Sequence, residues 1–293
     1  MISKYKWESL LLLGCFFWGI SAVVNVFALR SFSPFCFCGL RFLIGSVILS
    51  LFFRKDFLKI NKKIIKVSIA LAVFLASAFI FEVFALKFIT PVKVEFLVSL
   101  EIIIIPIIHF FMFKGNFTKT LISSIIVAFI GLLLINFNGV TFSFGVGELL
   151  ALISAMFYSM QVITIGEYAK DYNSGLITIL QLFFGSLICI FVALLFENIN
   201  YHISNESIIA LIISGIFCSG IAYYIGTVAQ KNIPTVHAGI IYSTIPLFSI
   251  IASKVALDIV LSPIAYVGCF AIILSIINLK TNVFGRLLMK FKK

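Results

Sequence analysis

The sequence predicts an all-α integral membrane protein: ten transmembrane helices in a five-plus-five inverted repeat around a central cavity, with both termini cytoplasmic. Three observations lead to this class: the composition, the length of the apolar runs and an internal repeat. Of the 293 residues, 62% are hydrophobic and 11% are charged, whereas about 25% of the residues in a soluble domain are charged. A soluble protein must cover its core with polar groups, so this composition excludes a soluble catalytic domain.

The apolar runs are long enough to cross a bilayer, which takes about 20 mostly apolar residues in a helix. Backbone polar groups in lipid must bond within their own segment, so runs of this length form helices. The predicted spans are 8–29, 33–53, 65–87, 92–113, 119–137, 146–167, 174–196, 206–229, 235–257 and 262–280. They predict a multi-pass protein of the cytoplasmic (cell) membrane.

The basic residues predict the orientation. The net charge of +11 would suggest nucleic acid in a soluble protein, but the basic residues concentrate in short loops at span ends. With the N-terminus in the cytoplasm, 17 of the 22 Lys and Arg residues fall on the cytoplasmic side, and Arg41 lies within a span. The remaining four lie outside: Arg30, Lys87, Lys93 and Lys254. We therefore expect cytoplasmic termini and no nucleic-acid partner.

The sequence gives no sign of a cofactor or a metal site. All six cysteines lie in or beside apolar spans without zinc-type spacing, and we interpret them as small buried hydrophobic residues. Nucleotide-binding loops are absent from the sequence, so energy is expected to come from gradients. The expected partners are a small-molecule substrate and membrane lipids, whose anionic head groups suit Lys62 and Lys63. The sequence does not decide whether the protein forms a homodimer.

The chain also repeats itself. A shift of 140 residues places Phe17-Trp18-Gly19 on Phe157-Tyr158-Ser159 and Pro106 on Pro246, and a shift four residues longer aligns 85–89 with 229–233. The repeat predicts two units, 1–140 and 141–293, with five spans each. Because five is odd, the second unit enters the membrane from the opposite side, which is typical of many secondary transporters.

Several short motifs in this order resemble one known family. They are Trp18-Gly19, Pro34 with Leu40-Arg41-Phe42, the stretch 147–155, Ala229–Pro234 and Ile245-Pro246-Leu247-Phe248. The chain resembles the drug/metabolite transporter superfamily, in particular its EamA-like branch. The resemblance implies ten helices around a central cavity, and exporters or importers of amino acids, metabolites, amines and drugs.

Two departures from that family limit what the resemblance implies. Many relatives carry a Glu just after spans four and nine, where this chain has Asn116 after Gly115, and Asp258 after Leu257. Relatives usually keep an apolar or aromatic residue where this chain has Glu101. The family's substrates therefore transfer poorly to this protein.

Charged residues inside the spans are candidates for function, because each costs at least ~2.5 kcal/mol at the membrane centre. Glu101 lies near the middle of span four, where a carboxylate can hold a cation or take up a proton; the alternative is a structural ion pair with Arg41. Glu82 either lies at the outer mouth of the cavity or pairs with Lys87 or Arg41. For Arg41 itself we favour a helix-positioning role.

Three further ionisable residues are expected to be structural. Glu95 lies close to the interface beside Lys93, and we expect it to reach water. His109 and His237 are expected to be satisfied interface histidines rather than proton relays.

Prolines and aromatic residues complete the predicted site. Pro106 and Pro246 interrupt spans four and nine at matching places, and paired interruptions in both halves point to a binding site. Tyr242 lies close to Pro246 along the helix. Span one contributes Trp18 and Asn25, span six Tyr158 and Gln161, and span eight Tyr224. Aromatic side chains with a carboxylate suit an organic cation.

These residues predict a secondary active transporter, not an enzyme. It would move a small organic metabolite (an amino acid, an amine or a drug-like solute) by alternating access, with proton coupling through Glu101 or Glu82 left open. A lipid-carrier flippase, which would need a lateral opening and a long apolar groove, is one alternative. An intramembrane enzyme is another, but it needs a nucleophile or metal cluster at one depth, and the scattered histidines and carboxylates do not supply one.

Overall fold

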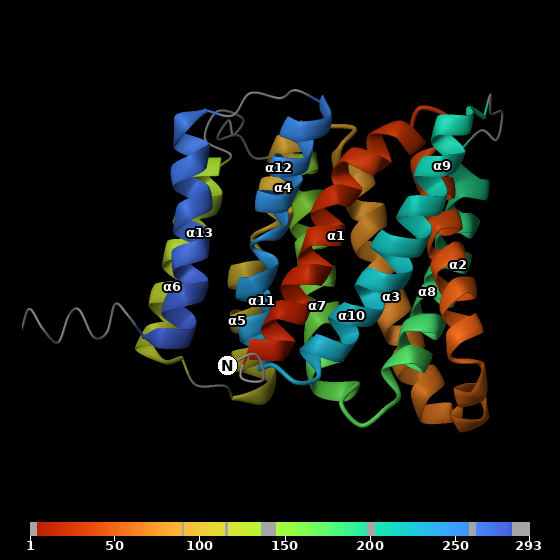
Figure 1. Ribbon diagram of the computed structural model, residues 1–293, viewed down its shortest axis with the longest axis horizontal. Helices are drawn as coiled ribbons and strands as arrows, with labels where there is room; N and C mark the ends of the chain where they lie inside the picture. The colour runs from red at the N-terminus through yellow and green to blue at the C-terminus, as the bar shows by residue number, and fades with distance from the viewer. Residues whose placement is uncertain are drawn as a thin grey trace, which may run out of the picture.

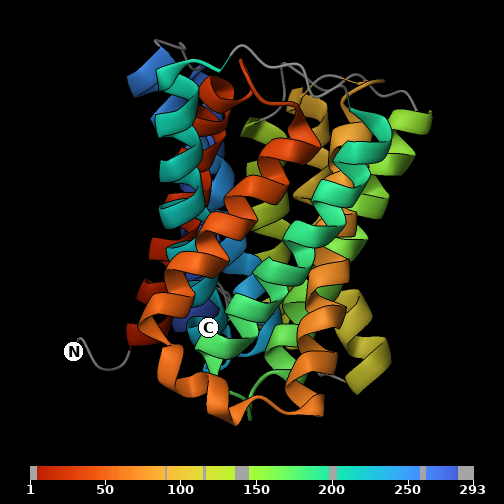
Figure 2. The ribbon, with the colours of Figure 1, turned by 90° about the vertical axis from the view of Figure 1, so that its right-hand side faces the viewer.

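The helices run side by side along one direction in this computed structural model (Figures 1 and 2). The structure describes residues 5–89, 91–114, 117–135, 145–197, 203–257 and 262–282. The predicted boundary at 140, the departures Gly115, Asn116 and Asp258, and the basic tail 283–293 lie outside the described residues. The lower end of the molecule is defined as the end that holds the start of α1 in Figure 1.

Within the described residues, eight helical stretches are long and apolar enough to cross a membrane. They are Lys6–Ala28, Pro34–Phe52, Lys62–Ala85, Lys93–Phe113, Val146–Tyr168, Ser174–Phe196, Asn205–Gln230 and Thr235–Ala256. Lys119–Ile135 and Pro263–Leu279 are shorter apolar helices. Each predicted span coincides with one of these stretches to within a few residues.

The helices divide more finely than the predicted spans. The first group is α1 (Lys6–Ala28), α2 (Pro34–Phe52), the 3-10 helix η2 (Arg54–Lys59), α3 (Lys62–Ala85), α4 (Pro91–Val98), α5 (Glu101–Phe113) and α6 (Lys119–Ile135). The second is α7 (Val146–Tyr168), α8 (Ser174–Phe196), α9 (Asn205–Ile213), the π-helix η3 (Ser214–Ile221), α10 (Ala222–Gln230), α11 (Thr235–Tyr242), α12 (Ile245–Leu257) and α13 (Pro263–Thr281).

Spans four and nine are each divided into two helices, as the predicted interruptions imply, although span four does not break at Pro106. Span four breaks between α4 and α5, and span nine breaks between α11 and α12, each at a two-residue turn. At the second turn the hydroxyl groups of Ser243 and Thr244 donate to the carbonyls of Ile240 and Ile241, at 2.6 and 2.7 Å. The backbone N–H groups of Ser243 and Thr244 donate to the same two carbonyls, so the oxygens at the end of α11 are fully bonded within the protein, as a low-dielectric environment requires.

The two groups of helices correspond in order and length. α1 and α7 each have 23 residues, α4 and α11 each have 8, and α5 and α12 each have 13. Residues 91 and 235, which begin α4 and α11, are 144 apart, as are residues 101 and 245, which begin α5 and α12. In this register Pro106 is the sixth residue of α5 and Pro246 the second of α12. The two prolines are therefore not at matching places. The shift that aligns the two halves is 140 residues at their first helices and 144 residues at the broken helices.

Side-chain caps at several helix starts explain where the helices begin. Asn61 accepts from the backbone N–H of Ile64 at 2.9 Å, and Asn173 accepts from that of Leu176 at 3.1 Å. Ser262 caps α13 in the same way. Asparagine and serine are preferred at this position because their oxygens bond N–H groups that have no partner in the first turn.

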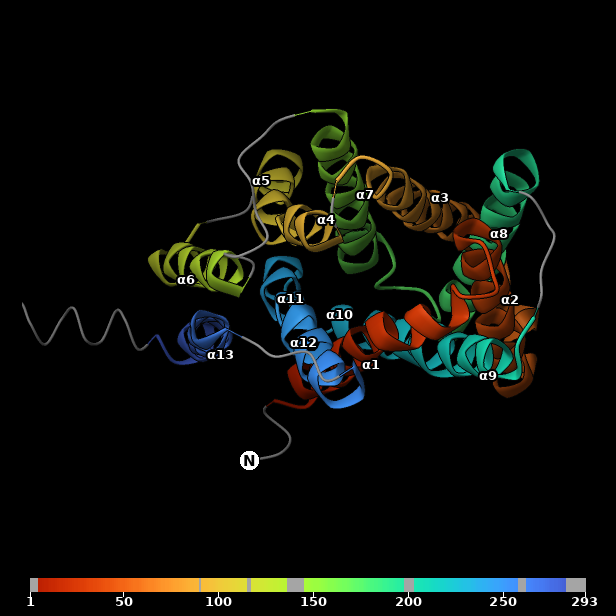
Figure 3. The ribbon, with the colours of Figure 1, turned by 90° about the horizontal axis from the view of Figure 1, so that it is seen from above.

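Close glycine contacts pair α6 with α13 at one end of the molecule (Figures 1 and 3). A Cβ on Gly131 would lie 2.8 Å from the Gly268 carbonyl, and a Cβ on Gly268 would lie 2.6 Å from the Gly131 carbonyl. The Asn278 amide donates to the hydroxyls of Ser123 and Ser124, both at 2.9 Å. Small residues and interhelical polar bonds are what hold helices together in lipid, where burial alone gives no driving force.

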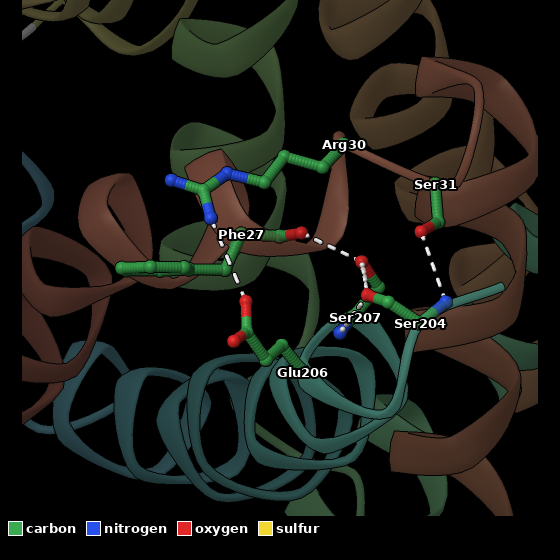
Figure 4. A network of polar contacts seen from close by, with 6 residues as sticks. All are labelled: Phe27, Arg30, Ser31, Ser204, Glu206 and Ser207. Atoms are coloured by element: carbon green, nitrogen blue, oxygen red, sulfur yellow. Dashed lines mark hydrogen bonds and ion pairs between the residues drawn. The ribbon is translucent and has the colours of Figure 1, made fainter.

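A polar network at the upper end ties α1 to α9 (Figure 4). The Ser207 hydroxyl donates to the Phe27 carbonyl at 2.9 Å, and the Ser204 N–H donates to the Ser31 hydroxyl at 3.3 Å. The Arg30 guanidinium lies 3.5 Å from the Glu206 carboxylate. Both side chains of this ion pair are exposed, so the pair contributes little to stability.

Replacing Gly131 with leucine should separate α6 from α13, because no space exists for a side chain against the Gly268 backbone. Overpacking of this kind costs about 1–3 kcal/mol. The expected result is a lower thermal unfolding midpoint of the purified protein in detergent. Ile126→Leu, on the exposed side of α6, serves as the control and should leave the midpoint unchanged. Equal midpoints for both variants would contradict the glycine contact.

Candidate functional site

A cavity of ≈ 380 Å³ lies among the helices of both groups. Nine of the eleven predicted site residues line it: Trp18, Asn25, Arg41, Glu82, Glu101, Tyr158, Gln161, Tyr242 and Pro246. They come from six of the predicted spans, so the fold brings together residues that are far apart in the sequence. Their role in binding stays a prediction.

Pro106 and Tyr224 do not line this cavity. Pro106 is buried inside α5. The Tyr224 ring packs against Phe53, with 5.0 Å between the ring centres. Neighbouring residues of a helix point about 100° apart, so Tyr223 takes the cavity-facing position. The predicted residue Tyr224 is therefore replaced in the wall by its neighbour, because the packing of α10 sets which side chain faces the cavity.

Arg41 is buried in the wall of the cavity and bonds neutral groups. Its Nε donates to the Ser219 hydroxyl at 2.8 Å, and its Nη1 lies 3.4 Å from the Ser21 hydroxyl and 3.5 Å from the Asn25 amide oxygen. No ion pair joins Arg41 to Glu101 or Glu82 in the described part of the chain, so both predicted pairs are wrong. Hydroxyl and amide oxygens close to Arg41 take the place of a carboxylate.

The π-helix η3 presents Ser219 to Arg41. π-helical segments are rare and occur frequently at functional sites. Gly45 of α2 allows the close approach, because a Cβ there would lie 2.8 Å from the Gly220 nitrogen in η3. Arg41 therefore fixes α2 against η3, as its predicted positioning role requires, while it also faces the cavity.

Three carboxylates line the cavity: Glu82 from α3, Glu95 from α4 and Glu101 from α5. Glu82 accepts a hydrogen bond from the Tyr158 hydroxyl at 2.9 Å. Its predicted partner Lys87 instead lies over the Phe84 ring, at 4.8 Å. Among the described residues, no side-chain hydrogen bond or ion pair neutralises Glu95 or Glu101. The cavity therefore holds three carboxylates against the single guanidinium of Arg41.

Lys93 does not compensate its neighbour Glu95. It forms a buried ion pair with Glu148 of α7, and both side chains are 6% exposed. The other Glu148 oxygen accepts from the Gly145 N–H at 2.9 Å, which caps α7. Sequence reasoning missed this pair. Two features of the sequence could have suggested the pair. Lys93 is one of the few basic residues predicted to lie outside, and Glu148 is an acidic residue in the first helical turn of the second unit.

Aromatic rings form another wall of the cavity. The Trp18 ring lies 5.2 Å from the Tyr223 ring and 5.6 Å from the Tyr242 ring. The Gln230 amide donates to the Tyr242 hydroxyl. The Trp18 indole N–H and the Gln230 amide oxygen are both buried without a hydrogen-bond partner in the described residues. Buried polar atoms of this kind need a partner, which a bound solute or water supplies.

A second pocket, of ≈ 430 Å³, lies below the first, between α5, α7 and α11. The His109 Nε2 lies 3.1 Å from the Glu167 carboxylate, and the Thr235 hydroxyl donates to the same oxygen at 2.5 Å. His109 is thus a paired interface histidine, as predicted. Lys231 donates to the Tyr172 carbonyl, and burial lowers the pKa of its ammonium group.

The sequence matches the model of the EamA-like transporter family twice, over residues 5–137 and 145–280. The chain belongs to the EamA-like transporter family. The predicted resemblance is therefore confirmed, and with the apolar helices it establishes an integral, multi-pass membrane protein.

Two relatives of this EamA-like protein carry transporter names. An uncharacterized transporter of Archaeoglobus fulgidus is 27% identical over 271 residues, which cover 91% of this chain and 83% of the relative. The uncharacterized transporter YetK of Bacillus subtilis is 25% identical over 274 residues, which cover 87% and 81%. Family and relatives together indicate a membrane transporter.

A crystal structure with a similar fold supports the helix arrangement. It superposes with a TM-score of 0.83 and 17% identity, over 96% of this chain and 98% of the other. At that identity the likeness concerns the fold alone. The chemistry of the EamA-like protein must therefore be argued from its own cavity.

Replacing Glu148 with glutamine should destabilise the protein strongly, because Lys93 would remain buried without its carboxylate. Breaking one member of a buried pair costs about 3–5 kcal/mol. The thermal unfolding midpoint measures the effect. Glu206→Gln is the matched control, because it breaks the exposed pair with Arg30, which is worth about 0–1 kcal/mol. If both variants unfold at the same temperature, the Lys93–Glu148 pair does not stabilise α4 against α7.

Proposed function

We propose that the protein is a secondary transporter that carries a small organic cation across the cell membrane by alternating access. The two groups of helices act as an inverted repeat of units 1–140 and 141–293, with both termini in the cytoplasm. The observation that carries the proposal is the acidic, aromatic-lined cavity between them.

The charges of the cavity favour a cation. Among the described residues the wall contains three carboxyl groups, Glu82, Glu95 and Glu101, and one guanidinium group, so acidic groups are in excess. Electrostatic attraction is strong in such a low-dielectric site. The faces of Trp18 and nearby tyrosines add cation–π attraction, which is worth about 2 kcal/mol or more when the site is desolvated.

The size of the cavity suits a small organic solute. Pockets for such ligands measure about 300–1,000 Å³, and this cavity measures ≈ 380 Å³. The Trp18 N–H and the Gln230 oxygen are enclosed by protein in this structure, so a solute would bond them only if the side chains around them moved. The solute would therefore combine an ammonium group with an apolar body and few hydrogen-bonding groups.

The proposed inverted repeat draws support from two observations. The family model matches once in each half of the chain. The helices of the two groups correspond in order and length, including the break in the helix before the last one of each group. Discontinuous helices of this kind form the substrate sites of many transporters built from inverted repeats.

The proposal can be tested with purified protein in liposomes. We expect the vesicles to exchange radiolabelled phenethylamine, while phenylacetate, which has a similar body but the opposite charge, neither exchanges nor competes. Glu101→Gln should weaken phenethylamine binding about tenfold, because a charge contact of about 1.4 kcal/mol is lost. Glu206→Gln, an exposed acid far from the cavity, is the control. Equal binding of amine and carboxylate would refute a cation site.

A further inference from the structure

The two broken helices pack together at one end of the molecule only. At the lower end, Ile105 of α5 belongs to one apolar cluster with Ala238 and Ile241 of α11. We call this contact the lower gate. At the upper end, α4 packs against α7 and α12 packs against α1, with no comparable contact between α4 and α12. The facing surfaces of α4 and α12 form the upper gate, which is open in this structure.

The repeat shows which residues would meet if the upper gate closed. In the 144-residue register α4 corresponds to α11, and α5 to α12, so closure would place α4 against α12 as α11 now lies against α5. Glu95 is the fifth residue of α4, and Gly239 is the fifth residue of α11. A Cβ on Gly239 would lie 2.9 Å from Ile105 Cδ1. Gly239 is thus buried in the closed lower gate. The residue at the matching position of the open upper gate, Glu95, is exposed and carries a carboxylate.

We propose that Glu95 controls the upper gate: α4 closes against α12 only after a positive charge has neutralised its carboxylate. This inference rests on the proposed alternating access. An unneutralised carboxylate buried in the gate would cost at least ~2.5 kcal/mol, enough to keep the gate open in most molecules. A proton or the ammonium group of a bound solute supplies the same charge and would release the gate.

Among the described residues, no Lys or Arg side chain forms an ion pair with Glu95. Lys93 on the same helix is paired with Glu148 of α7, and Arg41 of α2 bonds Ser219. Glu82 of α3 and Glu101 of α5, which line the same cavity, are acidic and supply no positive charge.

On the opposing helix α12 the charged residue is Lys254, which donates to the Tyr266 hydroxyl at 2.9 Å. Its counterpart in the lower gate, Phe110, packs on Phe117 rather than on α11. By the same correspondence Lys254 would point away from α4 in a closed upper gate. The charge that neutralises Glu95 must therefore come from outside the protein.

Accessibility of single cysteines to a water-soluble maleimide tests the inference. Ser99→Cys reports on the cavity from the upper side, and Ala238→Cys, fully buried now, reports on opening of the lower gate. Each labelling rate is divided by that of Leu58→Cys, at a position that is 94% exposed, because maleimide attacks the thiolate and every raw rate falls with pH. With Glu95 in place, this relative rate should fall severalfold for Ser99→Cys between about pH 9 and 5, and it should rise for Ala238→Cys. Adding phenethylamine at the higher pH shows whether an ammonium group has the same effect.

Glu95→Gln should make Ser99→Cys label slowly at every pH, because its neutral amide allows closure without a proton. Glu206→Gln is the control, because it removes an exposed acid at the upper end, outside the cavity, and it should keep the pH dependence. Labelling of Glu95→Gln at the same rate and with the same pH dependence as the parent would overturn the role of Glu95. If Ala238→Cys never labels under any condition, the proposed alternating access fails instead.

Discussion

The structure depends on one constraint: in a bilayer core every backbone N–H and C=O must find its partner within the protein. This requirement makes nearly all of the described chain helical, and it explains how the two interruptions are tolerated. The turn between α11 and α12 lies beside the cavity, where Ser243 is part of the wall, and its hydroxyl bonds the Ile240 carbonyl. The interruptions therefore stand where the protein, rather than lipid, surrounds the backbone.

In this low-dielectric environment the charged residues are of two kinds. Lys93 and Glu148 are buried and neutralise each other, so they hold α4 to α7 without offering charge to a solute. Glu95 and Glu101 face the cavity, where their charge is available. Arg41 stands between the two kinds, because its hydrogen bonds to neutral groups fix the helices while its positive charge stays uncancelled. Residue type alone does not show whether a buried charged residue is structural or functional. The distinction depends on whether another residue of the protein forms an ion pair with it.

Similar helices in the two groups are found in unequal surroundings. α5 and α11 pack closely at the lower end, whereas their counterparts α12 and α4 stand apart at the upper end. Glycine at position 239 permits the close contact, whereas the matching residue of α4 is Glu95, whose charge we propose opposes closure. If the halves exchange conformations, this difference in one residue gives the two ends of the pathway different sensitivity to charge. Sequence differences between two halves with the same backbone fold can in this way make the two ends of a transport pathway open and close under different conditions.

The sequence by itself determined the membrane class, the positions of the spans and the family, because apolar length and motif order are local properties of the chain. Most of the cavity wall could also be predicted from it. Charged residues inside spans are rare, and the aromatic residues recur at helical spacing, so both can be recognised in the sequence. Tertiary structure alone decided that Arg41 bonds Ser219 instead of Glu101, that Tyr223 rather than Tyr224 faces the cavity, and that span four breaks before Glu101 rather than at Pro106. These outcomes depend on the rotation and depth of each helix against its neighbours, and packing between distant segments sets both.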